Sequence, residues 1–149
     1  VVLLSNATGF DKKDTRQALK VLAEINGAVW AKLDGGSQEF FEQVSGSPFE
    51  LKTIVANIKN IPESLSLKIQ TCFMFLNNTP PSEKEIYAYK DQIKEILKGR
   101  RISEIQIYTL ARQPANSTVK ALSLKALKVI CRPLEDLPLK ISSFSGSAD

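Results

Sequence analysis

The chain has 149 residues, of which 43% are hydrophobic and 24% are charged, and these values are ordinary for a single globular domain. Twenty basic residues are interspersed with sixteen acidic ones, and the net charge of +4 gives little reason to expect a dedicated nucleic-acid-binding protein. The sequence has no histidine, which excludes histidine-based triads and histidine metal ligands, and no apolar run reaches the roughly 18 residues that a membrane span needs.

Strand-like and helix-like segments alternate along the chain. The expected strands cover residues 1–6, 28–34, 66–76 and 104–112. The expected helices, which have apolar residues at helical spacing or a cap at their start, cover residues 11–26, 37–45, 47–60, 82–98 and 122–137. Two of them begin in capping boxes, S-P-F-E at 47–50 and S-E-K-E at 82–85. Strands separated by helical crossovers predict βαβ units and therefore an α/β fold with a parallel sheet.

Three of the expected strands carry polar side chains on one face only. Residues two apart on a strand point the same way, so Lys32 and Asp34 are neighbours. The polar positions of the next two strands are Lys68, Gln70, Gln106, Tyr108 and Arg112. Strands of a doubly wound sheet are apolar on both faces, so this pattern predicts helices over the apolar face and an open barrel around a polar ligand. Four strands cannot close a barrel, which indicates part of one.

Polar residues also follow the expected strands where each strand ends. Ligands of parallel α/β proteins bind at the C-terminal ends of the strands. The polar residues at these ends are Ser5, Asn6, Lys32, Asp34, Asn77, Asn78 and Arg112. They are the candidate ligand contacts, although asparagine is also a common turn former.

The two cysteines, Cys72 and Cys131, are too few for a disulfide framework or a cysteine-rich metal site. Their apolar sequence surroundings predict buried free thiols and a cytoplasmic protein. The chain starts without Met inside the apolar run VVLLS and ends in the small, polar SSFSGSAD. We therefore expect a piece of a longer protein, with one domain over residues 1–140 and a flexible tail over 141–149.

Four segments in this order resemble the radical S-adenosylmethionine superfamily, and in particular its iron–sulfur oxidoreductases with an activating-enzyme-like core. The segments are SNATG at 5–9, VWAKLDGGSQEFFEQV at 29–44, FLNN at 75–78 and IQIYTLARQPA at 105–115. The resemblance covers roughly residues 1–130 and implies four parallel βα units, the third to sixth of an open TIM-like (β/α)6 barrel. In such enzymes the barrel holds S-adenosylmethionine against a 4Fe-4S cluster, and reductive cleavage yields a radical that abstracts hydrogen from the substrate.

The resemblance also implies roles for particular residues. Ser5-Asn6-Ala7 matches the family's Thr-Asn-Gly turn, with alanine at a position where glycine tolerates positive φ far better. Lys32 and Asp34 match lumen-facing positions that help to hold the amino-acid and ribose groups of the cofactor. Gln70, Tyr108 and Arg112 are implied as further lumen contacts.

The chain departs from the family in one respect. The Cys-x-x-x-Cys-x-x-Cys loop that binds the cluster and the Gly-Gly-Glu strand have no counterpart in it, and Cys72 and Cys131 cannot supply three convergent thiolates. The resemblance therefore implies the C-terminal part of such an oxidoreductase, inactive without the cluster-binding half. It leaves the substrate open among a protein, a tRNA and a small metabolite.

Other interpretations of the same residues stay open. Lys32 and Asp34 can form a purely structural ion pair at a strand end. A lysine inside a barrel can serve as the Schiff-base nucleophile of a lyase, although Asp34 favours its protonated form. The chain can also be a non-catalytic α/β binding or interaction module. For the half-barrel fragment, the uncovered first strand predicts an exposed sheet edge through which copies of the chain associate.

Overall fold

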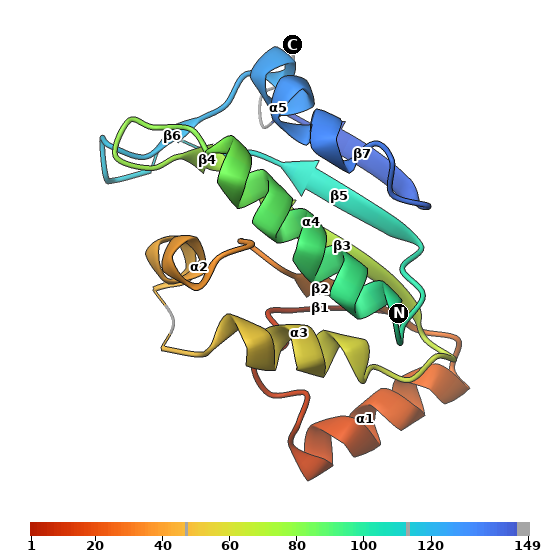
Figure 1. Ribbon diagram of the computed structural model, residues 1–149. Helices are drawn as coiled ribbons and strands as arrows, with labels where there is room; N and C mark the ends of the chain where they lie inside the picture. The colour runs from red at the N-terminus through yellow and green to blue at the C-terminus, as the bar shows by residue number, and fades with distance from the viewer. Residues whose placement is uncertain (47, 113, 146–149) are drawn as a thin grey trace.

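The computed structural model describes residues 1–46, 48–112 and 114–145 (Figure 1). Its main feature is a sheet of five parallel strands in the order β1-β2-β3-β5-β7, so each strand lies beside the next main strand along the chain. The strands are β1 (Val2–Ser5), β2 (Ala28–Lys32), β3 (Ser66–Cys72), β5 (Glu104–Tyr108) and β7 (Lys140–Phe144). The predicted α/β fold with a parallel sheet is confirmed.

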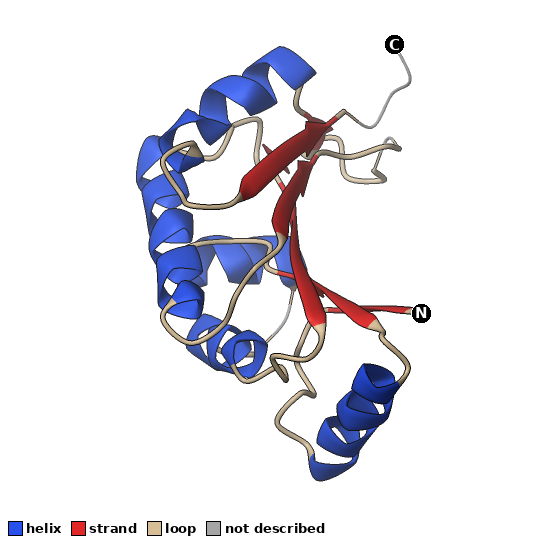
Figure 2. Cartoon of the chain, turned by 90° about the vertical axis from the view of Figure 1, so that its right-hand side faces the viewer, coloured by secondary structure: helices blue, strands red, loops and turns tan. Residues whose placement is uncertain are grey.

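The helices connect these strands. They are α1 (Lys13–Glu24), α2 (Gln38–Ser45), α3 (Leu51–Lys59), α4 (Glu83–Leu97) and α5 (Leu124–Cys131), which continues into the 3-10 helix η1 (Arg132–Leu134). Right-handed crossovers between sequential parallel strands place the helices on the same side, and Figure 2 shows α2–α5 together on one face of the sheet. Among the described residues, no helix is both long enough and apolar enough to cross a membrane.

The face under the helices is the apolar one, as predicted. Its strand residues, all at most 1% exposed, are Val29, Ala31, Leu67, Ile69, Ile105 and Ile107. They pack against helix residues such as Ile54, Ile86 and Ile93, which are equally buried. Burying each of the valine, leucine and isoleucine side chains in this layer contributes about 1.5–3 kcal/mol, so the layer holds the sheet and the helices together.

The predicted flexible tail is wrong for its first residues. Residues 140–144 form β7, which pairs in parallel with β5 and places Lys140 beside Glu104 and Ser142 beside Gln106. The sheet therefore has a fifth parallel strand that the sequence pattern did not predict, while residues 146–149 lie outside the described part of the chain.

The third expected strand is also divided. It ends as β3 at Cys72, and Met74–Phe75 forms a separate short strand, β4. β4 pairs antiparallel with β6 (Lys120–Ala121), so a small ribbon forms where β3 ends. The predicted strand end at Arg112 is also wrong, because β5 ends at Tyr108.

The two predicted capping boxes behave differently. Ser82 caps α4, since its hydroxyl oxygen accepts a hydrogen bond from the Glu85 backbone N–H at 3.1 Å. The helix expected from residue 47 begins instead at Leu51, and the Glu50 side chain that precedes it makes no capping hydrogen bond. Ser47, the predicted cap of that helix, lies outside the described residues.

Candidate functional site

The second face of the sheet, which we call the open face, has no helix over it in the part of the chain that the structure describes (Figure 2). The strand register brings its polar side chains into rows across the sheet. One row is Trp30, Lys68, Glu104 and Lys140, and the next, nearer the C-terminal strand ends, is Lys32, Gln70, Gln106 and Ser142. Cys72 and Tyr108 follow on the C-terminal side of these rows. The predicted polar face therefore exists.

An ion pair closes the C-terminal end of β2. The Lys32 Nζ lies 3.0 Å from Asp34 Oδ2, and the Asp34 side chain is only 11% exposed. The other carboxylate oxygen, Oδ1, accepts a hydrogen bond from the Cys72 backbone N–H at 2.9 Å. Asp34 therefore fastens the end of β2 to the end of β3 with one oxygen and holds Lys32 with the other.

Lys32 remains a charged amine in this setting. Burial alone would lower its pKa, but the Asp34 carboxylate and the Tyr108 hydroxyl raise the pKa above its ordinary value. Burial, together with the nearby Asp34 charge, in turn raises the pKa of Tyr108. A protonated lysine is a hydrogen-bond donor and a poor nucleophile, so this geometry counts against the Schiff-base interpretation.

The predicted site residues fall into two groups. Lys32, Asp34 and Tyr108 interact with one another, and Gln70 lies beside Lys32 in register and donates a hydrogen bond to Gln106 Oε1 at 2.9 Å. Arg112 does not join them. It is exposed in the loop after β5, and none of the described interactions connects it to this group.

Ser5 and Asn6 use their polar atoms within their own turn. Ser5 Oγ accepts a hydrogen bond from the Ala7 N–H at 3.1 Å, and Asn6 Oδ1 accepts one from the Thr8 hydroxyl at 2.9 Å. Ala7 has a φ of 62°, in the left-handed region, and its carbonyl accepts a hydrogen bond from the buried Asn57 side chain at 2.9 Å. Ala7 thus adopts a left-handed turn conformation although it has a Cβ, and the polar atoms of Ser5 and Asn6 are used within this turn and not at Lys32 and Asp34.

Sequence reasoning missed Glu104, the most connected side chain of the open face. Its carboxylate lies 2.8 Å from Lys68 Nζ and accepts a hydrogen bond from the Ser142 hydroxyl at 2.6 Å, while Lys140 lies at 3.3 Å. Lys68 also lies 5.3 Å from the centre of the Trp30 ring, a cation–π distance. The two-residue period of β5 places Glu104 on this face, but two of its partners lie on the unpredicted strand β7.

The hydrogen bonds from Lys68 and Ser142 lower the pKa of Glu104 to about 2. Because the folded-state pKa lies below the unfolded one, this stabilisation is complete above about pH 4.5 and is lost as the pH falls through about 2. We expect Glu104→Gln to lower the free energy of unfolding by about 1–2 kcal/mol at pH 7, with more than half of the difference gone by pH 3. Urea denaturation at both pH values measures it.

Glu39→Gln is the control for this measurement, because Glu39 is exposed and its carboxylate accepts only a 3.5 Å hydrogen bond from Gln43. Its effect should be small at both pH values. A Glu104→Gln penalty that is equally large at pH 3 and pH 7 would show that the loss comes from packing and not from the carboxylate charge.

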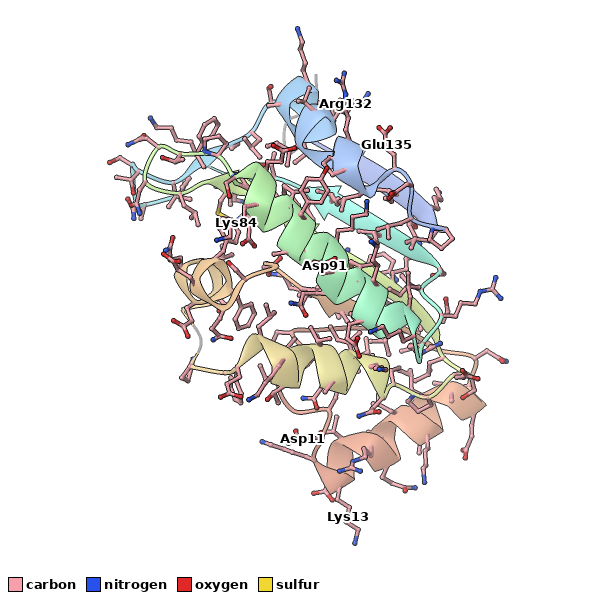
Figure 3. All side chains as sticks on the ribbon, viewed as in Figure 1. Asp11, Lys13, Lys84, Asp91, Arg132 and Glu135 are labelled. Atoms are coloured by element: carbon pink, nitrogen blue, oxygen red, sulfur yellow. The ribbon has the colours of Figure 1, made fainter. Side chains whose placement is uncertain are left out.

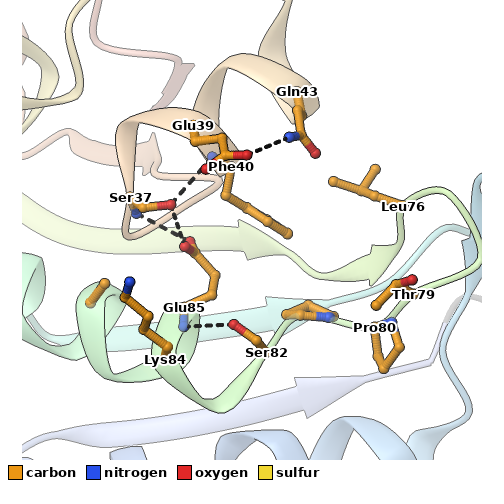
Figure 4. A pocket seen from close by; sticks show the side chains of 12 residues that line it. Ser37, Glu39, Phe40, Gln43, Leu76, Thr79, Pro80, Ser82, Lys84 and Glu85 are labelled. Atoms are coloured by element: carbon orange, nitrogen blue, oxygen red, sulfur yellow. Dashed lines mark hydrogen bonds between the residues drawn. The ribbon is translucent and has the colours of Figure 1, made fainter.

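A second unpredicted residue, Glu85, supports the loop that follows Asp34. Its carboxylate accepts hydrogen bonds from the Gly36 N–H at 2.5 Å, the Ser37 N–H at 3.2 Å and the Ser37 hydroxyl at 2.5 Å (Figure 4). Ser37 Oγ also caps α2 by accepting from the Phe40 N–H at 3.3 Å. Glu85 thus joins the start of α4 to the start of α2, behind the Lys32–Asp34 pair.

Beside this junction lies a cavity of about 400 Å³ between α2 and α4. Figure 4 shows Phe40, Leu76 and Pro80 on its wall, with Lys84 and Glu39 among the polar lining residues. Its charged residues are of both signs, and its deepest carboxylate, Glu85, already has three donors. The cavity therefore offers no charge that selects a ligand.

The two thiols are held in their neutral form. Burial raises the pKa of Cys72 to about 12 and that of Cys131 to about 11. Within residues 1–46, 48–112 and 114–145, no three histidine, cysteine, aspartate or glutamate side chains are placed to hold a metal ion.

Comparison with protein-family models and with curated protein sequences finds no match to this chain.

Proposed function

We propose that this chain is the C-terminal part of a radical S-adenosylmethionine iron–sulfur oxidoreductase, and that its open face forms the barrel wall that contacts the cofactor and the substrate. The observation that carries the proposal is the Lys32–Asp34–Tyr108 group, half-buried on a polar sheet face that no described helix covers. Sequential strand order with helices on one face is the arrangement of a (β/α) barrel, whereas a doubly wound sheet is covered on both faces.

The chemistry of this group suits the cofactor. Lys32 and Asp34 neutralise each other, so the best ligand has both an ammonium and a carboxylate and can exchange partners with them. The amino-acid part of S-adenosylmethionine has both. Lys32 would bind its carboxylate and Asp34 its amine, while Tyr108 and Gln70 offer hydrogen bonds to the ribose.

The cluster does not fit the residues of this chain. A 4Fe-4S centre needs convergent thiolates, whereas Cys72 and Cys131 are buried, protonated and on separate elements. The cluster would supply the electron for reductive cleavage, and the proposal places its ligands in a preceding part of the polypeptide. A cytoplasmic location belongs to the same proposal.

The edge of the sheet supports a continuing barrel. β1 is an edge strand in the sheet order, and its apolar residues Val2, Leu3 and Leu4 are 51%, 37% and 58% exposed. Apolar side chains exposed on both faces of an edge strand are what a preceding barrel strand and its helix would cover. The predicted exposed edge is therefore present, and self-association through it stays a prediction.

The coding sequence upstream of Val1 tests the proposal first. A Cys-x-x-x-Cys-x-x-Cys motif and a Gly-Gly-Glu strand are expected within about ninety residues, roughly two βα units. In the polypeptide that carries them, we expect Lys32→Gln to raise the Kd for S-adenosylmethionine about tenfold or more, measured by isothermal titration calorimetry.

Lys68→Gln is the matched control, because Lys68 lies on the same face one row further from the strand ends and pairs with Glu104. Its effect on the Kd should stay within about threefold. Lack of binding by the unchanged polypeptide, or the absence of the cysteine motif, would contradict the proposal and favour a non-catalytic α/β binding module.

A further inference from the structure

The excess positive charge of the chain is concentrated in one segment. Residues 112–134 contain five basic residues and no acidic one, whereas residues 1–111 contain fourteen basic and thirteen acidic residues. The interspersed charge expected from the composition thus describes only the first part of the chain. The basic segment runs from the loop after β5 through β6 and α5 into η1.

Three of these residues form a line along α5 and the start of η1. Lys125, Lys128 and Arg132 are three and four positions apart, which places them within about 60° of one another around the helix. All three are exposed, and Figure 3 shows Arg132 at the outer surface. None of the ion pairs among the described residues includes them.

The other two basic residues lie in the segment that leads into α5, nearer the C-terminal ends of the strands. Lys120 is exposed on β6, three residues before the Ser123 cap of α5, and Arg112 is exposed in the loop that leads from β5 to β6. Polar residues flank these two basic residues. The Asn78 N–H donates a hydrogen bond to the Thr118 carbonyl at 3.0 Å, and this bond joins the loop after β4 to the loop before β6. We call Arg112, Lys120, Lys125, Lys128 and Arg132 the basic stripe.

We propose that the basic stripe binds the phosphate backbone of a nucleic acid. Along α5 the three charges rise by about 4.5 Å and 6 Å, a spacing that suits a partner with a negative charge every few ångströms. Lysine and arginine beside exposed amide and hydroxyl groups are the side chains that contact phosphates.

The stripe does not suit a membrane or a protein partner equally well. A helix that lies on a membrane needs a broad apolar face, and a protein interface needs an apolar centre. The exposed large apolar residue within α5 is Val129, at 50% exposure, while Leu127 is buried in the core. A mainly apolar cavity of about 360 Å³ lies beside Arg132, with Val129 and Pro133 on its wall, but Lys125 and Lys128 do not line it. Positive charge that continues along α5 beyond this cavity favours a polyanion.

The stripe ends near the C-terminal edge of the sheet, where Lys32 and Asp34 lie. Under the proposed function the nucleic acid would therefore be the substrate, and this part of the inference rests on that function. Binding by the stripe itself does not depend on S-adenosylmethionine, so it can be tested without the cofactor.

The test is fluorescence anisotropy with a fluorescein-labelled single-stranded RNA of about 20 nucleotides, titrated between 50 and 200 mM KCl. For about five phosphate contacts, the slope of log K against log salt should be near −3.5. Lys125→Gln/Lys128→Gln/Arg132→Gln should weaken binding about tenfold or more at 50 mM KCl and reduce the size of the slope by about 2.

The control variant is Lys12→Gln/Lys13→Gln/Lys20→Gln, which removes the same charge from exposed positions with acidic residues close in sequence. Lys12 directly precedes α1, Lys13 and Lys20 lie on it, and Figure 3 shows Lys13 at the opposite end of the molecule from Arg132. Its Kd should stay within about threefold of the unchanged protein. Equal losses in both variants, no RNA binding at 50 mM KCl, or binding to phosphatidylserine vesicles instead of RNA would each overturn the inference.

Discussion

Replacing Gly36 by alanine is expected to destabilise the protein by about 3 kcal/mol or more, a large fraction of a typical unfolding free energy. A Cβ at this position would lie 1.9 Å from the Tyr89 backbone nitrogen and 2.4 Å from its Cα. Both atoms belong to the middle of α4, whose backbone cannot move without disturbing the core around Tyr89, which is fully buried. Urea denaturation followed by the fluorescence of Trp30, the single tryptophan, measures the loss.

Gly9→Ala is the matched control for this substitution. A Cβ at Gly9 would meet no atom closer than 3.9 Å, so we expect a change within about 0.5 kcal/mol. The contrary result is an unfolding free energy for Gly36→Ala equal to that of the unchanged protein. It would show that the loop after Asp34 can move away from α4, and that the close approach does not hold this loop in place.

Gly36 shows how far a sequence motif can be interpreted without the structure. From the sequence alone, the Gly-Gly pair after Asp34 indicates only a turn. The structure supplies a packing reason, because Gly36 lets the loop touch the backbone of α4, and its N–H donates to Glu85 at 2.5 Å. The packing partner lies about fifty residues away, and no local pattern identifies it.

Regular local patterns allowed most of the sheet to be predicted. A two-residue period places Lys32 and Asp34 on one face and Ala31 and Leu33 on the other. Ala31 and Leu33 are fully buried and Lys32 is half-buried, whereas Asp34 is buried by its contacts at the strand ends. β7 lacks such a contrast, because serines stand on both of its faces, at Ser142 and Ser143. Its strand conformation comes from pairing with β5, and such a non-local cause leaves little mark on the sequence.

Strand periodicity also allowed part of the candidate site to be predicted. Lys32, Asp34, Gln70 and Tyr108 share a face because strand periodicity places them there. Arg112 was assigned to the same strand, but β5 ends at Tyr108 and Arg112 lies in the exposed loop beyond. Ser5 and Asn6 stand at a strand end as predicted, yet their side chains bond within the turn, a local choice that these residue types commonly make.

Removing the carboxylate that joins α2 to α4 is the second substitution with a large expected effect. Glu85→Ala leaves the Gly36 N–H, the Ser37 N–H and the Ser37 hydroxyl without their acceptor. Glu85 is only 6% exposed, so water replaces it poorly, and we expect a loss of about 3 kcal/mol in urea denaturation. Glu85→Gln keeps one acceptor oxygen and should cost about 1 kcal/mol.

Glu83→Gln, on the exposed side of the same first turn, should change stability by less than about 0.5 kcal/mol. A double-mutant cycle with Ser37→Ala separates the hydrogen bonds from the packing, and it should give a coupling energy of about 1–2 kcal/mol between Ser37 and Glu85. A coupling near zero, or equal losses for Glu85→Gln and Glu85→Ala, would mean that the volume of the side chain, not its acceptor oxygens, holds the loop behind the Lys32–Asp34 pair.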